Sequence, residues 1–302
     1  MKRVLVTGAS GFLGRHTLAP LVARGYEVHA AARHTLPVCE HVTWHQLDLL
    51  DPVALRALVR SLEPTHLLHA AWLMTPGVYA RSPENLAWVR ASLVLLEEFA
   101  AQRGRRAVGV GTCFEYDSQA GLCSEQTALA STSLYGSAKI ALQEVASAFA
   151  RESSISFAWA RVFFLYGPHE HPSRLVASVV RSLLSDEPAR CSHGEQVRDL
   201  LHIEDAGAAL AAVLDAPVEG PINVASGHGI ALKEVILRAA DKLGRRHLVQ
   251  LGAIQAPPHE PPAIVADVTR LSRETGWTPS YDLDAGLDHT IAWWRTRLSE
   301  RG

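Results

Sequence analysis

The sequence has few cysteines and no cluster of basic residues. Its four cysteines, Cys39, Cys113, Cys123 and Cys191, are widely separated and lack the C-x-x-C spacing of metal and redox sites, so they are interpreted as reduced thiols. The 29 Lys and Arg residues are balanced by 31 Asp and Glu residues, and the formal net charge is −2. We therefore expect neither a metal site nor a nucleic-acid partner.

The chain also lacks a long hydrophobic run. No signal-like apolar region follows the opening segment KRVLVTGAS, and no later run reaches the roughly 20 residues of a membrane-spanning helix. We expect a soluble cytoplasmic protein with no membrane partner. Apolar side chains are nevertheless abundant, since 48% of the 302 residues are hydrophobic and 20% are charged. Such a chain can bury a large core.

The first half alternates short β-branched runs with segments of helical periodicity. Strands are predicted at 3–8, 26–33, 41–49, 65–71 and 106–112, and helices at 12–25, 51–62 and 83–104. Asp51 is the expected N-cap of the second helix, with Pro52 in its first turn. This alternation predicts an α/β fold with a doubly wound parallel sheet, the Rossmann arrangement, covered by helices on both faces.

A glycine-rich segment, TGASGFLG, joins the first strand to the first helix. Gly8 allows a tight turn, Gly11 lets the backbone approach a pyrophosphate, and Gly14 permits close packing of helix on strand. The helix N-terminus offers free N–H groups to the anion. Because this segment lies at the start of a βαβ unit, a dinucleotide-binding turn is favoured over a merely structural one.

A second motif, SLYGSAK, places Tyr135 and Lys139 four residues apart on a predicted helix. Residues i and i+4 share a helix face, so the ammonium lies near the phenol and near a bound nicotinamide ribose. A tyrosine with its usual pKa of about 10 is a poor acid near neutrality, and a nearby positive charge lowers that pKa. The alternative is an ordinary exposed Tyr/Lys pair.

With these motifs in order, the chain resembles the extended short-chain dehydrogenase/reductases of the NAD(P)-dependent epimerase/dehydratase family, which act mainly on nucleotide sugars. The resemblance covers nearly the full length and rests on TGASGFLG, LDL, LHAA, YGSAK, ARVFFLYGP, VRDLLHIEDAGAAL, INVASG and GWTPSYDLDAGLDHTIAWW. It implies an NAD(P)-binding Rossmann domain at 1–168. Residues 169–302 form mainly a smaller, interleaved substrate-binding domain, with segments that return to the sheet.

The resemblance also implies roles for individual residues. Thr112, four residues before Tyr116, is the hydroxyl that polarises the substrate, Tyr135 is the general acid-base, and Lys139 holds the ribose and tunes Tyr135. The implied cofactor-binding residues are Gly8, Ser10, Gly11, Phe12, Leu13, Gly14, Arg33, Asp48, Leu49, Ala70, Ala71, Tyr135 and Lys139. Arg198 is implied to contact the nucleotide diphosphate, with a surface salt bridge as the alternative.

The activity implied is that of an NADPH-dependent ketoreductase acting on a nucleotide-linked keto-sugar, most plausibly a 4-keto-6-deoxyhexose. An epimerase that keeps its NAD(P) and a non-catalytic dinucleotide-binding protein stay open as alternatives. A homodimer is implied by the helices at about 84–102 and 133–151, which relatives commonly pair into a four-helix bundle. The intact Thr112, Tyr135 and Lys139 count against a non-catalytic protein.

The end of the second strand indicates the cofactor. Ala32 stands where NAD-preferring relatives carry an acidic residue for the ribose 2′-hydroxyl, and Arg33 follows it. Without the carboxylate, a 2′-phosphate meets no repulsion, and Arg33, together with Arg15, is suited to bind it. We therefore expect NADP(H) rather than NAD(H), with stacking of Arg33 on adenine as the alternative.

Several positions depart from the family pattern. Trp88 stands where relatives usually have Asn, and APPHEPPA replaces an Arg-Pro-Gly-Asp run. The two residues after Thr112 are Cys113 and Phe114, where 4,6-dehydratases carry an Asp-Glu acid pair, so a dehydratase is disfavoured. Cys113 is interpreted as a small packing residue. Glu115 is either a substrate contact or a structural group at the strand end.

The segment HEH at 169–171 resembles a metal site. It offers two histidines, His169 and His171, in an extended loop without a third ligand at a recognisable spacing. A role in the substrate loop or contact with solvent is therefore favoured over metal binding.

Overall fold

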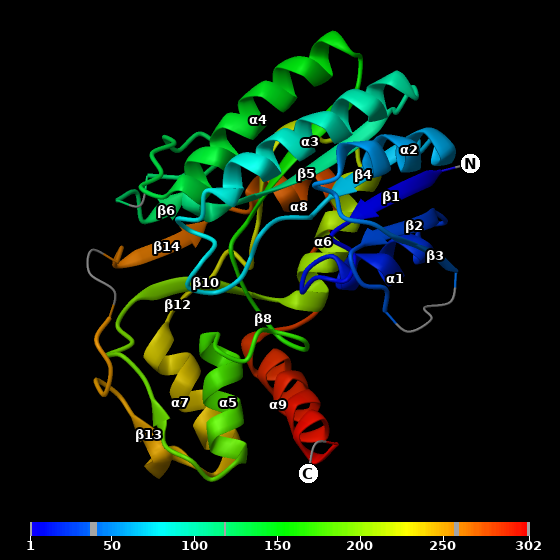
Figure 1. Ribbon diagram of the computed structural model, residues 1–302. Coiled ribbons are helices and arrows are strands. Elements are labelled where there is room, and N and C mark those ends of the chain that lie inside the picture. Colours follow the sequence, from blue (N-terminus) through cyan, green and yellow to red (C-terminus); the bar gives the residue numbers. More distant parts are fainter. Residues whose placement is uncertain (1, 37–40, 118, 257–259, 301–302) are drawn as a thin grey trace.

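A computed structural model describes residues 2–36, 41–117, 119–256 and 260–300, and its main feature is a seven-stranded sheet (Figure 1). The strands lie in the order β11, β7, β5, β4, β1, β2, β3. Every neighbouring pair is parallel, so the carboxyl ends of the strands meet at one edge. The bounds are β1 (Arg3–Thr7), β2 (Glu27–Ala32), β3 (Val42–Gln46), β4 (His66–His69), β5 (Arg106–Thr112), β7 (Ser156–Val162) and β11 (Gly220–Val224).

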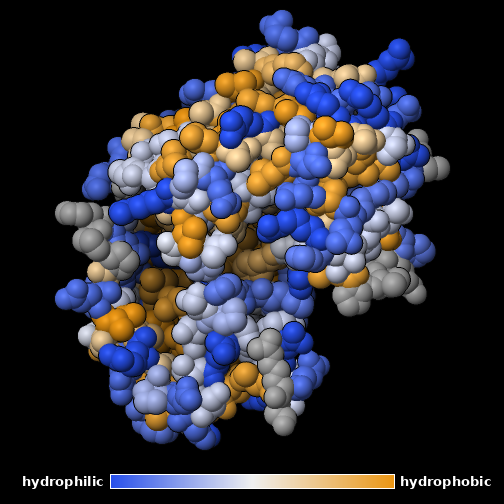
Figure 2. Space-filling view, viewed as in Figure 1, coloured by the Kyte–Doolittle hydropathy of each residue, from blue (hydrophilic) through white to orange (hydrophobic). Residues whose placement is uncertain are grey.

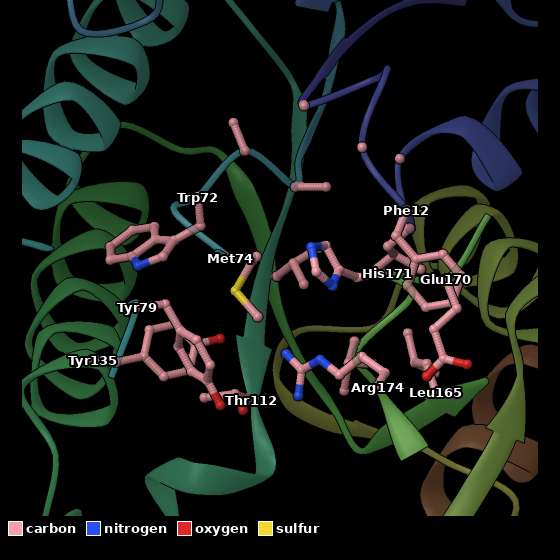
Figure 3. Close-up of a pocket in the computed structure, with 18 of the residues that line it drawn as sticks. Phe12, Trp72, Met74, Tyr79, Thr112, Tyr135, Leu165, Glu170, His171 and Arg174 are labelled. Atoms are coloured by element: carbon pink, nitrogen blue, oxygen red, sulfur yellow. The ribbon is translucent and has the colours of Figure 1, made fainter. Parts of the chain in front are cut away.

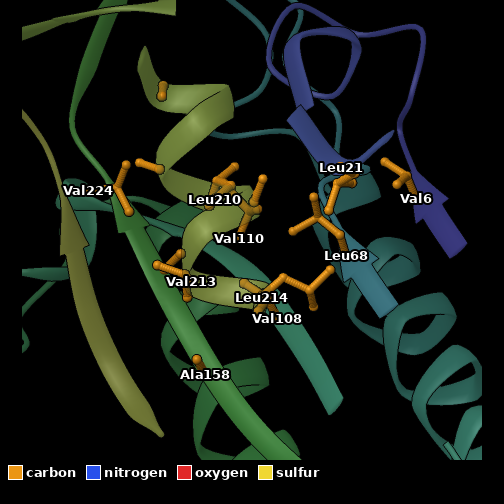
Figure 4. Packing of buried hydrophobic residues seen from close by; sticks show 14 of the residues in the cluster. Val6, Leu21, Leu68, Val108, Val110, Ala158, Leu210, Val213, Leu214 and Val224 are labelled. Carbon is orange, nitrogen blue, oxygen red and sulfur yellow. The ribbon is translucent and has the colours of Figure 1, made fainter. Parts of the chain in front are cut away.

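Helices cover both faces of this sheet. One face packs against α1 (Arg15–Ala23), α6 (Ile203–Asp215) and α8 (Thr269–Thr275), and the other against α2 (Pro52–Leu62), α3 (Glu84–Ala101) and α4 (Leu134–Glu152). Side chains alternate along each strand, and Val4 and Val6 of β1 join the first layer while Leu5 joins the second. Figure 4 shows the first layer, where Leu210 and Val213 of α6 lie against the sheet.

A smaller unit lies beyond the carboxyl edge of the sheet (Figure 1). It is built on strands β6 (Leu122–Cys123), β8 (Phe164–Tyr166), β10 (Val197–His202), β12 (Gly229–Ala231) and β14 (Ala263–Ala266). A helical cluster packs below them, formed by α5 (Leu175–Leu184), α7 (Leu232–Leu243) and α9 (Leu283–Ser299). The remaining short elements are β9 (Ala189–Arg190), β13 (Val249–Gln250) and the 3₁₀ turns η1 (Cys113–Glu115) and η2 (Arg246–Leu248).

The predicted doubly wound parallel sheet is confirmed, and its early elements lie where the periodicity placed them. Asp51 caps α2 as expected, because its Oδ1 accepts hydrogen bonds from the N–H groups of Val53 and Ala54 at 2.9 and 3.1 Å. The chain crosses between the two units several times: α6 and β11 follow β10 back to the large sheet, and β6 belongs to the small one.

Two other predictions from the sequence concern membrane-spanning helices and the cysteines. In the part of the chain that the structure describes, no helix is both long and apolar enough to cross a membrane. Cys113, Cys123 and Cys191 are buried free thiols, whereas Cys39 lies outside the described residues.

Candidate active site

A cavity of about 500 Å³ lies between the carboxyl edge of the large sheet and the smaller unit. Figure 2 shows the molecule hollowed between these two parts, with hydrophobic residues deep in the hollow. The glycine-rich loop lies at one end, Thr112 closes β5 beside the cavity, and Arg198 of β10 lines the part formed by the smaller unit. This is the edge at which parallel α/β sheets bind ligands.

The glycine-rich loop packs too closely for side chains. Gly8 has φ +69°, and a Cβ there would lie 2.7 Å from the backbone of Ala71. A Cβ on Gly14 would meet the carbonyl oxygen of Gly8, and one on Gly11 would lie 3.0 Å from the same oxygen. The loop therefore presents backbone to the cavity at the start of α1, as a dinucleotide pyrophosphate requires.

The structure brings the expected cofactor-binding residues together along one continuous cavity. Those lining it are Gly8, Ser10, Gly11, Phe12, Leu13, Gly14, Arg33, Asp48, Leu49, Ala70, Ala71, Tyr135 and Lys139. Arg33 is exposed just past the end of β2, and His34 lies beside it on the cavity wall. Arg15 is absent from the lining, and its guanidinium donates to the Ser10 carbonyl at 2.9 Å. A cavity lined by these residues and by the backbone of the glycine-rich loop fits a dinucleotide.

Tyr135 and Thr112 meet at the middle of the cavity. Tyr135 lies in the first turn of α4, which Ser133 caps by accepting the Gly136 N–H at 3.1 Å. Both side chains line the cavity, and Figure 3 shows the Tyr135 phenol directed toward Thr112. Burial raises the pKa of Tyr135, and the Thr112 hydroxyl only partly opposes that effect. Tyr135 is therefore a neutral phenol, able to donate a proton.

Lys139 lies behind Tyr135, one helical turn further along α4. Its ammonium is buried, donates to the Val110 carbonyl at 2.7 Å, and lies 3.7 Å from the centre of the Trp72 ring. Burial lowers the pKa of Lys139 to about 7, although the charge of Glu115 opposes this. Burial is the largest influence on the pKa of Tyr135 and raises it, whereas the sequence predicted that Lys139 lowers it.

Glu115 does not line the cavity. It is fully buried behind Thr112, and its carboxylate accepts hydrogen bonds from the Thr112 N–H at 2.8 Å, the Arg161 Nε at 2.7 Å and the Trp159 indole at 3.0 Å. The suggested substrate contact is thus not available to this side chain. The position of Glu115 agrees with the alternative, a structural group at the strand end, because its carboxylate holds the backbone N–H of Thr112.

Arg198 lines the cavity but is already paired. Its guanidinium lies 2.8 Å from the Glu260 carboxylate, which also accepts a hydrogen bond from Gln196 at 2.7 Å. The side chain of Arg198 is 3% exposed and that of Glu260 is 25% exposed, so the pair is largely withdrawn from water. Glu260 comes from the segment that replaces the Arg-Pro-Gly-Asp run, of which residues 257–259 lie outside the described part of the chain.

Further residues line the cavity beside Tyr135 and on the wall opposite it, among them His171, for which the sequence favoured a substrate-loop or solvent role. Trp72 and Trp88 contact each other at a tilt, with ring centres 6.2 Å apart, and both line the cavity. In Figure 3, Tyr79 and Met74 lie on the side of Tyr135, and Arg174, His171 and Glu170 lie opposite. The local signals for this second group were the HEH segment, for which a substrate-loop role or solvent contact was favoured, and its position after the strand end FLYGP, a place where binding residues gather.

Cys113 and Phe114 follow Thr112 on the cavity wall. Cys113 is 4% exposed, and burial strongly raises the pKa of its thiol. Phe114 is 39% exposed and meets Phe164 edge to face, with ring centres 5.8 Å apart. Neither side chain carries a carboxyl group, so the paired-acid chemistry of a dehydratase has no residues here.

The one group of potential metal ligands within the described ranges is not the HEH segment. It consists of His202, Glu204 and His289, whose ligand atoms lie within 4.8 Å of one another. The Nδ1 atom of His202 accepts the Glu204 N–H that begins α6, at 3.4 Å, which favours the tautomer with hydrogen on Nε2. This tautomer suits a helix cap. A histidine that binds a metal through Nε2 instead carries its hydrogen on Nδ1 and donates it to a neighbouring group.

Comparison with known proteins identifies the family. Residues 4–225 match the model of the NAD dependent epimerase/dehydratase family, and the chain belongs to this family. A dTDP-glucose 4,6-dehydratase of Xanthomonas campestris is 24% identical over 97% of this chain and 93% of its own length.

Solved structures show the same fold. The UDP-glucose 4-epimerase of Thermotoga maritima, solved with UDP-glucose, has a TM-score of 0.89 at 22% identity and covers 98% of this chain and 99% of its own. MoeE5, in complex with UDP-glucuronic acid and NAD, has a TM-score of 0.86 at 28% identity with the same coverage of 98% and 99%. The resemblance seen in the sequence is thereby confirmed at the level of family and fold.

Proposed function

We propose that this protein is an NADPH-dependent ketoreductase acting on a nucleotide-linked keto-sugar, most plausibly a 4-keto-6-deoxyhexose. The observation that carries the proposal is the position of Tyr135: a neutral phenol that lines the same cavity as Thr112 and the glycine-rich loop. A bound nicotinamide supplies hydride to the carbonyl carbon. Tyr135 then gives its proton to the carbonyl oxygen, and Thr112 donates a hydrogen bond to the same oxygen.

The residues beside Thr112 favour reduction over dehydration. A dehydratase must protonate a leaving hydroxyl and remove a neighbouring proton, whereas Cys113 and Phe114 offer a buried thiol and a hydrocarbon ring. Reduction needs one hydride and one proton, which Tyr135 and the cofactor provide. The nucleotide-linked substrate is suggested by the family and by relatives whose names specify nucleotide sugars.

NADP(H) is proposed as the cofactor because of the end of β2. Arg33 is exposed on the cavity wall, where a 2′-phosphate requires a cation, and Ala32 before it provides no carboxylate. Solved relatives, MoeE5 among them, carry NAD, so the proposed preference for NADP(H) is supported by Ala32 and Arg33 alone.

A nucleotide-sugar epimerase with tightly held NAD(P) is the second candidate, because Thr112, Tyr135 and Lys139 serve either reaction. The two are separated by giving the protein NADPH with a panel of nucleotide-linked keto-sugars and, in a parallel assay, NAD(P)+ with nucleotide sugars that carry a hydroxyl in place of the ketone, while absorbance of the reduced cofactor is followed in both. A ketoreductase consumes NADPH continuously with formation of the hydroxyl product. Interconversion of nucleotide sugars without net change in NADPH absorbance would instead establish the epimerase.

A further inference from the structure

Besides Arg33 at the end of β2, two further arginines line the cavity, and their surroundings differ. Arg198 is paired with Glu260 at 2.8 Å, so its charge is largely compensated before a ligand arrives. Arg174, immediately before α5, makes no side-chain hydrogen bond or ion pair to any residue in the described ranges. Its guanidinium instead lies 5.6 Å from the centre of the Tyr79 ring.

Arg174 is directed across the cavity toward the reacting groups. Figure 3 shows its guanidinium extending from the wall that carries Glu170 and His171 toward Tyr79 and Thr112. Tyr79 in turn meets Tyr135 edge to face, with ring centres 5.1 Å apart. The cation is therefore separated from the Tyr135 ring by one aromatic side chain, close enough for one substrate to touch both.

The nearest carboxyl group does not cancel this charge at neutral pH. Glu170 is 6% exposed, and its Oε2 has no hydrogen-bond partner within the described residues. Burial raises the pKa of Glu170 to about 8, although Arg174 partly opposes the shift. Glu170 is thus mainly protonated near pH 7, and the positive charge of Arg174 stays available to a ligand.

We propose that Arg174, rather than Arg198, binds the anionic group of the substrate. This inference rests on the proposed function, because it requires a substrate that carries an oxyanion. The guanidinium is a planar fork of donors suited to the oxygen pairs of phosphate and carboxylate. The diphosphate of the nucleotide is the source that fits a 6-deoxyhexose, whose C6 carries no carboxylate, and a carboxylate of the sugar would indicate a different sugar. Arg198 remains bound to Glu260, whose carboxylate repels a second anion.

The test compares Arg174→Gln and Arg198→Gln with the control Arg181→Gln. Arg181 lies in α5, the helix that begins just after Arg174, and does not line the cavity. The full chain is saturated with NADPH, and calorimetry measures the binding of two sets of anionic probes. The nucleotides UDP, dTDP, CDP and GDP are each compared with their uncharged nucleoside, and glucuronate is compared with glucose. The nucleotide arm reports phosphate recognition, and the glucuronate arm reports carboxylate recognition.

We expect Arg174→Gln to weaken binding of the oxyanion probe about tenfold or more, with its uncharged counterpart unaffected. Arg198→Gln and Arg181→Gln should change it less than about threefold, and Arg174→Lys should recover part of the loss. The proposal is overturned if the wild-type protein prefers neither anionic probe over its neutral counterpart. It is also overturned if Arg198→Gln causes the loss and Arg174→Gln does not.

The reaction and the subsite can fail separately. Oxyanion binding that depends on Arg174, without reduction of any keto-sugar, would keep the subsite and reject the ketoreductase. NADPH-dependent reduction with an unchanged KM in Arg174→Gln would keep the reaction and reject the subsite.

Discussion

The backbone N–H of Thr112 donates a hydrogen bond of 2.8 Å to the carboxylate of Glu115, a side chain that does not reach the cavity. The same carboxylate lies 2.7 Å from the Nε of Arg161, and both side chains are almost fully buried. A buried ion pair therefore holds the end of β5, and with it Thr112, which lines the cavity. Glu115 is accordingly a positioning residue.

Replacing Glu115 with Gln should damage both stability and turnover. The change leaves Arg161 as a buried charge without its counter-ion, which typically costs about 3–5 kcal/mol. We expect a lower urea midpoint, and in the folded fraction a lower kcat with the KM for NADPH nearly unchanged. The control is Glu195→Gln, which removes an exposed partner of Lys233 and should leave both quantities unaltered. An unchanged kcat in folded Glu115→Gln would remove the positioning role.

Tyr135→Phe tests the proton donor directly. The phenol is buried among aromatic rings, so loss of one oxygen should leave the fold intact, while the carbonyl oxygen loses its acid. We expect kcat to fall about 10²-fold or more. NADPH binding, followed by fluorescence, should persist, and it should weaken in Lys139→Ala together with the rate. Turnover near the wild-type value in Tyr135→Phe would mean that another group supplies the proton.

Local patterns predicted the fold and the groups at the centre of the cavity because those features depend on neighbouring residues. Gly8, Gly14 and the Tyr135–Lys139 spacing each act within one turn or one βαβ unit. Arg198 shows where this reasoning ends. Its partner Glu260 is 62 residues away, so only the folded chain reveals that the expected phosphate-binding cation is already paired. The same holds for Arg174, which meets Tyr79 from a distant segment.

Glu170 predicts a specific pH dependence of stability. Its pKa is about 8 in the folded protein against an ordinary value of 4.5, so between these values the folded state holds a proton that the unfolded state has released. Stability from this group is therefore complete below pH 4.5 and is lost as pH rises through 8, by at most about 1.4 kcal/mol per pH unit. Glu170→Gln should remove this slope.

The measurement is the free energy of unfolding in urea at pH 5, 6.5 and 8. The difference between Glu170→Gln and wild type should shift in favour of the variant as pH rises, whereas exposed Glu187→Gln should show no such trend. Above pH 8, ionised Glu170 also compensates Arg174, so oxyanion binding should weaken in wild type and persist in Glu170→Gln. A pH-independent difference in stability would show that Glu170 titrates normally.

Arg33→Ala tests the choice of cofactor. Removing the exposed cation at the end of β2 should reduce kcat/KM for NADPH about tenfold and leave kcat/KM for NADH nearly unchanged, because only the former carries a 2′-phosphate. Steady-state rates with both cofactors at one keto-sugar concentration give the ratio. Equal losses with both would favour stacking of Arg33 on adenine, and a wild-type preference for NADH would refute the assignment.

Cys113→Ala separates a packing role from a catalytic one. The thiol lies next to Thr112 on the cavity wall, but burial raises its pKa strongly, so at neutral pH it is neither a thiolate nucleophile nor a base. The side chain packs with Tyr116, Phe163 and Ile264, and alanine should lower stability modestly by leaving a small void. Activity should remain within a few-fold of wild type.

Because Thr112→Ala removes the neighbouring hydroxyl and should abolish most turnover, it serves as the matched comparison. Loss of activity in Cys113→Ala with an unchanged circular dichroism spectrum would make the cysteine catalytic, and would favour the epimerase over the ketoreductase.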